Sequence, residues 1–241
     1  MRLAVLSDIH ANLEALEKVL EDIDRCNVDD TITLGDNIGY GPDPDGVIDI
    51  LCRRQVGTIM GNHELALSRP NYLAWFNPVA QKALVRTMEM LSSGAMEWIA
   101  GLDVSMVRHG FRFVHGFPPD SATRYLFQVA AADMPKVFQE LKEPVCYIGH
   151  THEVAMISFD GDVVDYPRLT PGIHRLQPDH RYIINVGSVG QPRDRDRNAK
   201  YVIMDTELRS IELRIVEYDR LKTAAKIIRA GLPKLYADRL L

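Results

Sequence analysis

Residues that could do chemistry follow short apolar runs at several points along the chain. Five of the eight histidines have this position, together with two aspartates and one asparagine. The set is Asp8, His10, Asp36, Asn62, His63, His115, His150 and His152. Ligands of open α/β sheets collect beyond the carboxyl ends of the strands, where rigid strands deliver converging loops. If each apolar run is a strand, the sequence predicts one shared polar site.

The donor atoms of this set favour a metal site. Imidazole nitrogens, carboxylates and an amide oxygen, with no thiolate, suit Mn, Fe, Zn, Co or Ni, and the imidazoles are too many for Ca²⁺. Seven candidate ligands exceed what one tetrahedral zinc uses, whereas two cations sharing a carboxylate would use them all. Taken singly, each motif also fits a turn, a loop or a helix start. Their order along the chain favours a dinuclear centre.

The elements that must position these side chains form an α/β pattern. An apolar stripe at Leu13, Leu16, Leu20 and Ile23 predicts a helix after the first run, with Asn12 as its cap. Six short aliphatic runs are predicted as strands, at residues 3–6, 31–34, 56–60, 111–114, 145–148 and 182–184.

Further elements follow from turn and cap signals. Asn77 and Pro78 predict the start of a helix that continues to about Met90. Two antiparallel pairs are predicted, one at residues 155–159 and 163–166 and one at residues 201–204 and 211–216. We expect a single domain over residues 1–241, with a C-terminal helical tail from about residue 219 whose basic residues form a solvated face.

Composition narrows the class of protein. With 46% hydrophobic and 25% charged residues, the chain has the proportions of a soluble globular protein. A formal net charge of −5 argues against a broad nucleic-acid-binding surface. Three cysteines without C-x-x-C spacing predict buried free thiols in a reducing compartment. No run of residues predicts a signal peptide or a membrane span, so we expect a cytoplasmic protein with no membrane partner. The oligomeric state stays open.

Over about residues 2–205, the ordered motifs resemble the calcineurin-like metallophosphoesterase family, and in particular its small prokaryotic phosphodiesterase-type branch. The motifs are Asp8-Ile9-His10, Gly35-Asp36-Asn37, Gly61-Asn62-His63-Glu64, Val114-His115-Gly116 and Gly149-His150-Thr151-His152. The resemblance implies a four-layer α/β/β/α sandwich of two mixed sheets, with two metals at the strand ends.

The resemblance also implies a role for each residue. A water or hydroxide between the two cations would attack phosphorus directly, with no covalent enzyme intermediate, and Mn is favoured for activity. His63 resembles the family's catalytic histidine, placed to stabilise phosphoryl oxygens or to protonate the leaving group. One metal would be held by Asp8, His10, Asp36 and His152, and the other by Asp36, Asn62, His115 and His150, with Asp36 bridging.

Departures from the family pattern bear on the substrate. Tyr40 stands where Ser/Thr protein phosphatases and symmetrical diadenosine tetraphosphatases carry a phosphate-binding arginine. Arg193 could bind a substrate phosphate instead, although the alternating charges of residues 193–197 also fit a solvated loop. The aromatic side chains of residues 72–76 and the loop 117–125 could wall a pocket for a base or could cap the core.

We therefore expect a metal-dependent hydrolase of phosphoester bonds, in the first place a phosphodiesterase. A phosphomonoesterase and a dinucleoside polyphosphate pyrophosphatase share the metal core and stay open as alternatives. A catalytically silent interaction scaffold, such as the retromer subunit of this fold, is a remote alternative, because such scaffolds lose ligands or catalytic histidines. The expected partner is a small phosphoester or nucleotide substrate.

Overall fold

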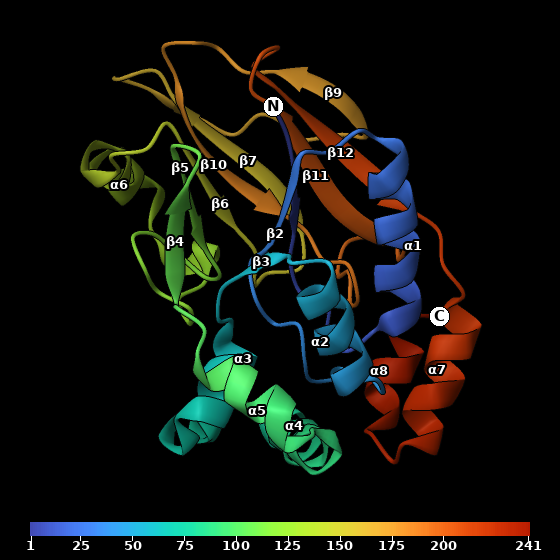
Figure 1. Cartoon of the computed structure of the whole chain (residues 1–241). Helices are drawn as coiled ribbons and strands as arrows, with labels where there is room; N and C mark the ends of the chain where they lie inside the picture. Colours follow the sequence, from blue (N-terminus) through green and yellow to red (C-terminus); the bar gives the residue numbers. More distant parts are fainter.

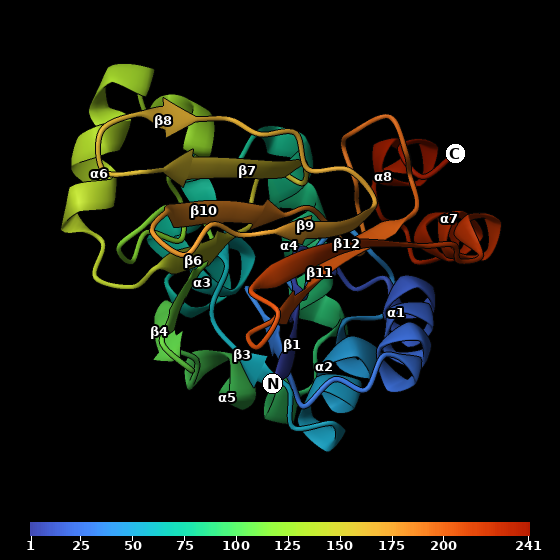
Figure 2. The same ribbon diagram turned by 90° about the horizontal axis from the view of Figure 1, so that it is seen from above.

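Two six-stranded sheets lie face to face in the computed structural model, which describes residues 1–241 (Figures 1 and 2). The first sheet has the order β3 (Gly57–Thr58), β2 (Asp30–Thr33), β1 (Arg2–Leu6), β11 (Ala199–Asp205), β12 (Ser210–Val216) and β9 (Gly172–Arg175). The second has the order β4 (Ser105–Arg108), β5 (Phe111–Val114), β6 (Val145–Ile148), β10 (Arg181–Val186), β7 (Val154–Phe159) and β8 (Val164–Asp165).

Both sheets are mixed, and each contains a parallel block of three strands. β1, β2 and β3 run parallel in the first sheet, and β5, β6 and β10 run parallel in the second. The antiparallel strands β11 and β7 flank these blocks. Because parallel strands end at the same edge of a sheet, each block delivers its following loops to one place.

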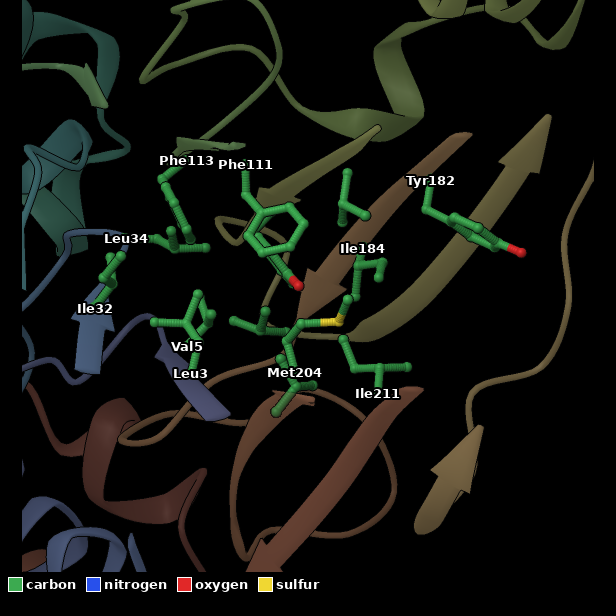
Figure 3. Packing of buried hydrophobic residues seen from close by; sticks show 14 of the residues in the cluster. Leu3, Val5, Ile32, Leu34, Phe111, Phe113, Tyr182, Ile184, Met204 and Ile211 are labelled. Carbon is green, nitrogen blue, oxygen red and sulfur yellow. The ribbon is translucent and has the colours of Figure 1, made fainter. Parts of the chain in front are cut away.

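The core between the sheets explains why these strands are so apolar. Figure 3 shows Leu3, Val5, Phe113, Ile184 and Met204 pointing into this layer, within a cluster of 19 buried residues. The residues between them on the same strands point to the opposite face of each sheet, where they pack against helices. Strands buried on both faces carry continuous hydrophobic runs, which is the pattern in the sequence.

Helices cover the outer face of each sheet and complete the four predicted layers. α1 (Leu13–Arg25) and α2 (Pro44–Arg53) pack on the outer face of the first sheet, and α6 (Met134–Glu140) packs on the second. The other helices are α3 (Asn62–Ser68), α4 (Pro78–Met90), α5 (Ser93–Ala100), α7 (Arg220–Arg229) and α8 (Lys234–Asp238), with three 3₁₀ helices, η1 (Pro70–Trp75), η2 (Leu126–Gln128) and η3 (Ala131–Asp133). The predicted four-layer α/β/β/α sandwich is confirmed.

Local signals predicted several boundaries correctly. The Asn12 side chain caps α1 by accepting the Ala15 N–H, and Asn77 caps α4 by accepting two N–H groups. β7 pairs with β8 and β11 pairs with β12, so both antiparallel pairs are confirmed. No helix is long and apolar enough to cross a bilayer.

Three expectations differ from the structure. The strand expected at residues 56–60 has only two residues in β3, because the chain turns away there to begin the loop before α3. β4 and β9 were not predicted, since both are short strands at sheet edges with little hydrophobic alternation. Of the three cysteines only Cys146 is buried; Cys52 is exposed on α2, because its position lies on the helix face turned from the sheet.

Candidate metal centre

The eight candidate residues lie at adjoining ends of the two sheets. The loops after β1 and β2 carry Asp8, His10 and Asp36, the first turn of α3, after β3, carries Asn62 and His63, and the loops after β5 and β6 carry His115, His150 and His152. All are buried except Asn62, which is partly buried. Backbone hydrogen bonds join the loops, among them the Asp8 N–H to the Gly35 carbonyl. The structure therefore brings together every residue that the sequence singled out for this site.

One set of ligand atoms belongs to Asp8, His10, Asp36 and His152, and all lie within 4.8 Å of one another. The Nε2 atoms of His10 and His152 are 3.1 Å apart. The Asp8 Oδ1 atom lies 3.1 Å from His152 Nε2 and has no hydrogen-bond partner although it is buried. Two carboxylates and two imidazoles that converge in this way can hold a divalent cation.

A second set contains Asp36, His115 and His150. His115 Nε2 lies 3.1 Å from His150 Nδ1 and 3.3 Å from Asp36 Oδ2. The Asn62 Oδ1 atom is 3.1 Å from the same nitrogen, which brings the amide oxygen into this set. Asp36 is common to both sets, and a carboxylate can coordinate two cations where an imidazole nitrogen serves one.

Each of these four imidazoles has one ring nitrogen hydrogen-bonded to a backbone carbonyl. His10 Nδ1 lies 3.1 Å from the Ile38 carbonyl, and His152 Nδ1 lies 2.6 Å from the Gln191 carbonyl. Since a carbonyl only accepts, each Nδ1 carries the proton, and the neutral ring then has a bare lone pair on Nε2. These two lone pairs face each other across 3.1 Å, an arrangement that is repulsive without a cation.

The second pair of imidazoles repeats this arrangement. His115 Nδ1 donates to the Leu34 carbonyl at 3.0 Å, and His150 Nε2 donates to the Thr123 carbonyl at 3.3 Å. The remaining nitrogens, His115 Nε2 and His150 Nδ1, again face each other at 3.1 Å. Metal-ligating histidines characteristically donate their other ring N–H to a carbonyl. The buried Asp and His clusters therefore fit a divalent metal centre.

Charge in the buried cluster favours a cation as well. Burial alone would raise the pKa of Asp36, but nearby imidazoles, above all His115, outweigh burial and hold that pKa below its usual range. Burial would lower the pKa of His115, yet the facing Asp36 carboxylate raises it to about 9. Burial lowers the pKa of His150 to about 3 and that of His152 to about 4. The His150 and His152 rings are therefore neutral, as metal ligands must be, and the second proton of His115, which the Asp36 carboxylate favours, is the one that a bound cation would displace.

The backbone at the site is strained. Asp8, His10, Asp36, His150 and His152 all have positive φ, between 49° and 67°. Residues other than glycine rarely adopt this conformation, and the cost is of order 1–3 kcal/mol for each. Such residues concentrate where function requires a particular side-chain direction, and here the strained backbone turns five side chains toward one point.

Glu64 fixes the position of the loops that carry Asp36 and Asn62. Its buried carboxylate accepts the N–H groups of Asp36 at 2.8 Å, Asn37 at 2.7 Å and Gly61 at 2.9 Å. Burial and the Asp36 carboxylate raise the pKa of Glu64, and these N–H groups oppose the rise. Gly61 has to be glycine, because a Cβ there would lie 2.1 Å from Asp36 Oδ1. The sequence analysis assigned no role to Glu64.

His63 lies beside both metal sets and lines the adjacent cavity. Its backbone N–H donates to Asp36 Oδ1 at 2.9 Å, and its Nε2 is 3.8 Å from Asp36 Oδ2. Its ring makes edge contacts with Tyr40 and Phe76, at centroid distances of 4.5 and 5.0 Å. Burial lowers the pKa of His63 to about 3, so the ring is neutral at pH 7. A Cβ on Gly39 would lie 2.1 Å from His63 Nδ1, so that glycine makes room for the ring.

A cavity of about 480 Å³ opens next to the metal sets. Its walls include Tyr72, Trp75 and Phe76 on one side and Tyr125, which stacks on the His150 ring at a centroid distance of 3.7 Å. The expected aromatic wall is therefore present. Arg193 also lines the cavity, although the side chain is exposed. The volume lies within the range of small-molecule sites.

One wall of this cavity comes from the C-terminal end of the chain and was not predicted. Leu235, Tyr236 and Arg239, in and directly after α8, line it together with Tyr40. The expected solvated face on the C-terminal helices is thus only part of their surface. A short helix at the end of the chain has no sequence signal that associates it with the strands that precede the candidate ligands, the last of which ends at Ile148, and only the fold brings them together.

Comparisons with known proteins agree with this arrangement. A family model for the calcineurin-like phosphoesterase superfamily domain matches residues 1–209. An uncharacterized protein of Methanocaldococcus jannaschii is 32% identical, over 99% of this chain and 96% of the relative. A solved metallophosphoesterase from Sphaerobacter thermophilus is 34% identical with a TM-score of 0.83, over 100% of this chain and 98% of that chain. A hypothetical protein from Pyrococcus horikoshii OT3 has the same fold, with 19% identity, a TM-score of 0.80, and coverage of 99% and 97%.

Proposed function

The chain belongs to the calcineurin-like phosphoesterase superfamily and is a phosphoric ester hydrolase, and we propose that its reaction is the hydrolysis of phosphodiesters. The observation that supports this most is the placing of two facing imidazole pairs, joined by Asp36, at the wall of a cavity with aromatic rings on two sides. A phosphodiester has an organic group on each side of phosphorus. Phe76 beside His63 and Tyr125 on His150 offer a contact to each group.

In this proposal seven residues hold two divalent cations. Asp36 joins the two sets, and the carbonyl-bonded histidines keep their lone pairs directed inward. Two bound cations lower the pKa of a water molecule so that it can act as a nucleophile near neutral pH, and they neutralise phosphoryl charge. The full set is Asp8, His10, Asp36, His152, Asn62, His115 and His150.

His63 acts on the phosphoryl group in this proposal. Its ring lines the cavity and is held by the Asp36 carboxylate, through the backbone N–H, and by two aromatic neighbours. The ring lies beside both metal sets at the cavity wall, where it can offer an N–H to a phosphoryl oxygen or to the leaving group.

Arg193 supplies positive charge on the substrate side of the site. Its backbone N–H donates to the His152 carbonyl at 3.2 Å, which fixes the start of the loop relative to the metal set. The next residue, Asp194, forms an ion pair with Lys200 at 2.8 Å. Because Asp194 pairs with Lys200, it does not neutralise the Arg193 guanidinium, which can then bind a phosphate oxygen.

The direct test compares Asp36→Asn with the parent and with Asp49→Asn. Asp36→Asn retains the shape of the side chain but removes a charge shared by both metal sets. Asp49→Asn is the same change at an exposed position on α2. With bis-p-nitrophenyl phosphate and Mn²⁺, we expect Asp36→Asn to lose bound metal and activity together and Asp49→Asn to retain both. Equal rates for Asp36→Asn and the parent would refute the site assignment.

The class of ester is tested by comparing substrates with the parent enzyme. We expect a higher kcat/KM for bis-p-nitrophenyl phosphate than for p-nitrophenyl phosphate with Mn²⁺, Zn²⁺, Ni²⁺ or Co²⁺. A preference for the monoester would overturn the phosphodiesterase proposal and leave the metal centre in place. Faster cleavage of dinucleoside polyphosphates than of either ester would establish a pyrophosphatase instead.

A further inference from the structure

The C-terminal helices form one wall of the cavity although they lie outside the region that matches the superfamily. The match ends at residue 209, whereas α7 begins at Arg220 and α8 at Lys234. Figure 1 shows both helices beside the N-terminal end of α1. The loop that carries Asp8 and His10 leads into this end of the helix. Leu235, Tyr236 and Arg239 all line the cavity. This wall is therefore an addition to the shared metal centre.

A buried polar network holds α7 against the start of α1. The Thr223 hydroxyl donates to Asn12 Oδ1 at 3.1 Å, and the Asn12 amide donates to the Gly190 carbonyl at 3.0 Å. Lys226 donates to Glu14 Oε1 at 2.8 Å and forms an ion pair with Asp43. Hydrogen bonds to charged groups are stronger than those between neutral groups, and partial burial reduces their competition with water. The helix pair is therefore held in a defined position.

Tyr236 connects α8 to the site by two routes. Its ring is buried and stacks on Tyr40 at a centroid distance of 4.2 Å, and Tyr40 in turn packs on His10 and His63. Its carbonyl accepts the Gln191 side-chain N–H at 3.1 Å, and the Gln191 carbonyl accepts the His152 Nδ1 proton. Tyr40, which stands where the resemblance places an arginine in other family branches, thus packs against the C-terminal helix α8.

Arg239 and Arg193 are the two basic side chains that line the cavity. The Arg239 guanidinium lies over the Tyr236 ring, with its Cζ 5.6 Å from the ring centroid. The cation–π contact restrains an otherwise exposed side chain without occupying the N–H groups of its guanidinium. No carboxylate is paired with it, so these groups are free to bind an anion.

We propose that α8 forms a distal subsite in which Arg239 binds a second phosphate of the substrate, one that is not hydrolysed. This rests on the proposed phosphodiesterase function. The aromatic rings of the cavity suit a flat base, and a guanidinium suits a phosphate. The preferred substrate is therefore a short nucleotide diester with a terminal phosphate, which a 5′-phosphorylated adenylyl dinucleotide represents.

The kinetic test compares Arg239→Gln with Arg229→Gln on two substrates. The first substrate is the 5′-phosphorylated dinucleotide pApA, and the second is ApA, which lacks the terminal phosphate. Arg229 is exposed on α7 and does not line the cavity, so it is the matched control. We expect the ratio of kcat/KM for pApA over ApA to fall about tenfold in Arg239→Gln, mainly through KM, and to stay parental in Arg229→Gln. An unchanged ratio in Arg239→Gln overturns the subsite.

A binding measurement separates this proposal from the reaction itself. With metal removed by EDTA, pApA is titrated into each protein while tryptophan fluorescence is followed, and Trp75→Phe identifies the signal from the cavity. We expect the Kd for pApA to rise about tenfold in Arg239→Gln and to stay unchanged in Arg229→Gln. If the parent cleaves neither dinucleotide nor bis-p-nitrophenyl phosphate, the phosphodiesterase proposal fails, and this binding difference still decides the subsite. Absence of pApA binding to the parent overturns the subsite.

Discussion

Replacing Glu64 by glutamine tests how the site is held in place. In the parent, Glu64 Oε2 accepts the N–H groups of Asp36 and Gly61, and Oε1 accepts the N–H and the side-chain amide of Asn37. Glutamine retains the size of the side chain but offers only one oxygen. Its NH₂ group would have to face two N–H donors, which leaves them without an acceptor.

The size of the effect follows from the number of hydrogen bonds lost. Either orientation of the glutamine amide removes two hydrogen bonds, and bonds to a charged acceptor contribute about 1.5–3 kcal/mol each. We therefore expect Glu64→Gln to lower the free energy of unfolding by about 3–6 kcal/mol, a large part of the ~5–15 kcal/mol typical of a domain. Because the released loops carry Asp36 and Asn62, we expect metal affinity to fall about 10–100-fold.

Two measurements check this expectation. Chemical denaturation of the metal-free protein gives the free energy of unfolding, and titration with Mn²⁺ against a competing chelator gives the metal affinity. Glu17→Gln makes the same change at an exposed position on α1 and should leave both unchanged. If Glu64→Gln lost stability but bound Mn²⁺ as tightly as the parent, Glu64 would be a structural residue with no positioning role. If neither quantity changed, the hydrogen-bond reasoning would be wrong.

Two further predictions follow from the site. Removing metal with EDTA should lower the thermal unfolding midpoint, and added Mn²⁺ should restore it. The reason is that a ligand at 100 times its Kd stabilises the folded protein by about 2.7 kcal/mol. An unchanged midpoint in differential scanning calorimetry would argue against the metal centre. Gly39→Ala should reduce kcat by about 10–100-fold at unchanged metal content. The added Cβ would lie 2.1 Å from His63 Nδ1, and φ at this position is +81°. A parental kcat in this variant would show that His63 can move without loss of activity.

Much of the fold could be predicted because its signals are local. The runs that became β1 and β6 are buried on both faces beyond Arg2, so each is hydrophobic there and ends abruptly at a polar motif. Asn12 and Asn77 were recognisable as caps because capping depends on residues two or three positions away. β9 lacked such a signal, since a short edge strand depends on pairing with β12 rather than on its own sequence.

The grouping of the candidate ligands was also predictable from the sequence. Strand ends in a parallel block lie at one edge whatever the intervening helices do, so Asp8 and Asp36 had to approach one another in the first sheet, and His115 and His150 in the second, once their strands were assigned. The meeting of these two groups depended on how the two sheets pack. The clamp that Glu64 forms was not predictable, because two of its donors, the N–H groups of Asp36 and Asn37, are 28 and 27 residues away in the sequence.

By itself, the sequence determined which strands are followed by candidate ligands and which donor atoms the site offers, since both depend on residue type and short-range pattern. Only the tertiary structure decided the tautomers of the imidazoles, through carbonyls such as Ile38 and Gln191, and the positive φ values that aim their side chains. It alone also placed Tyr236 and Arg239 in the cavity. That placement depends on contacts such as Lys226 with Glu14, 212 residues apart, and no periodicity in the chain encodes a contact at that separation.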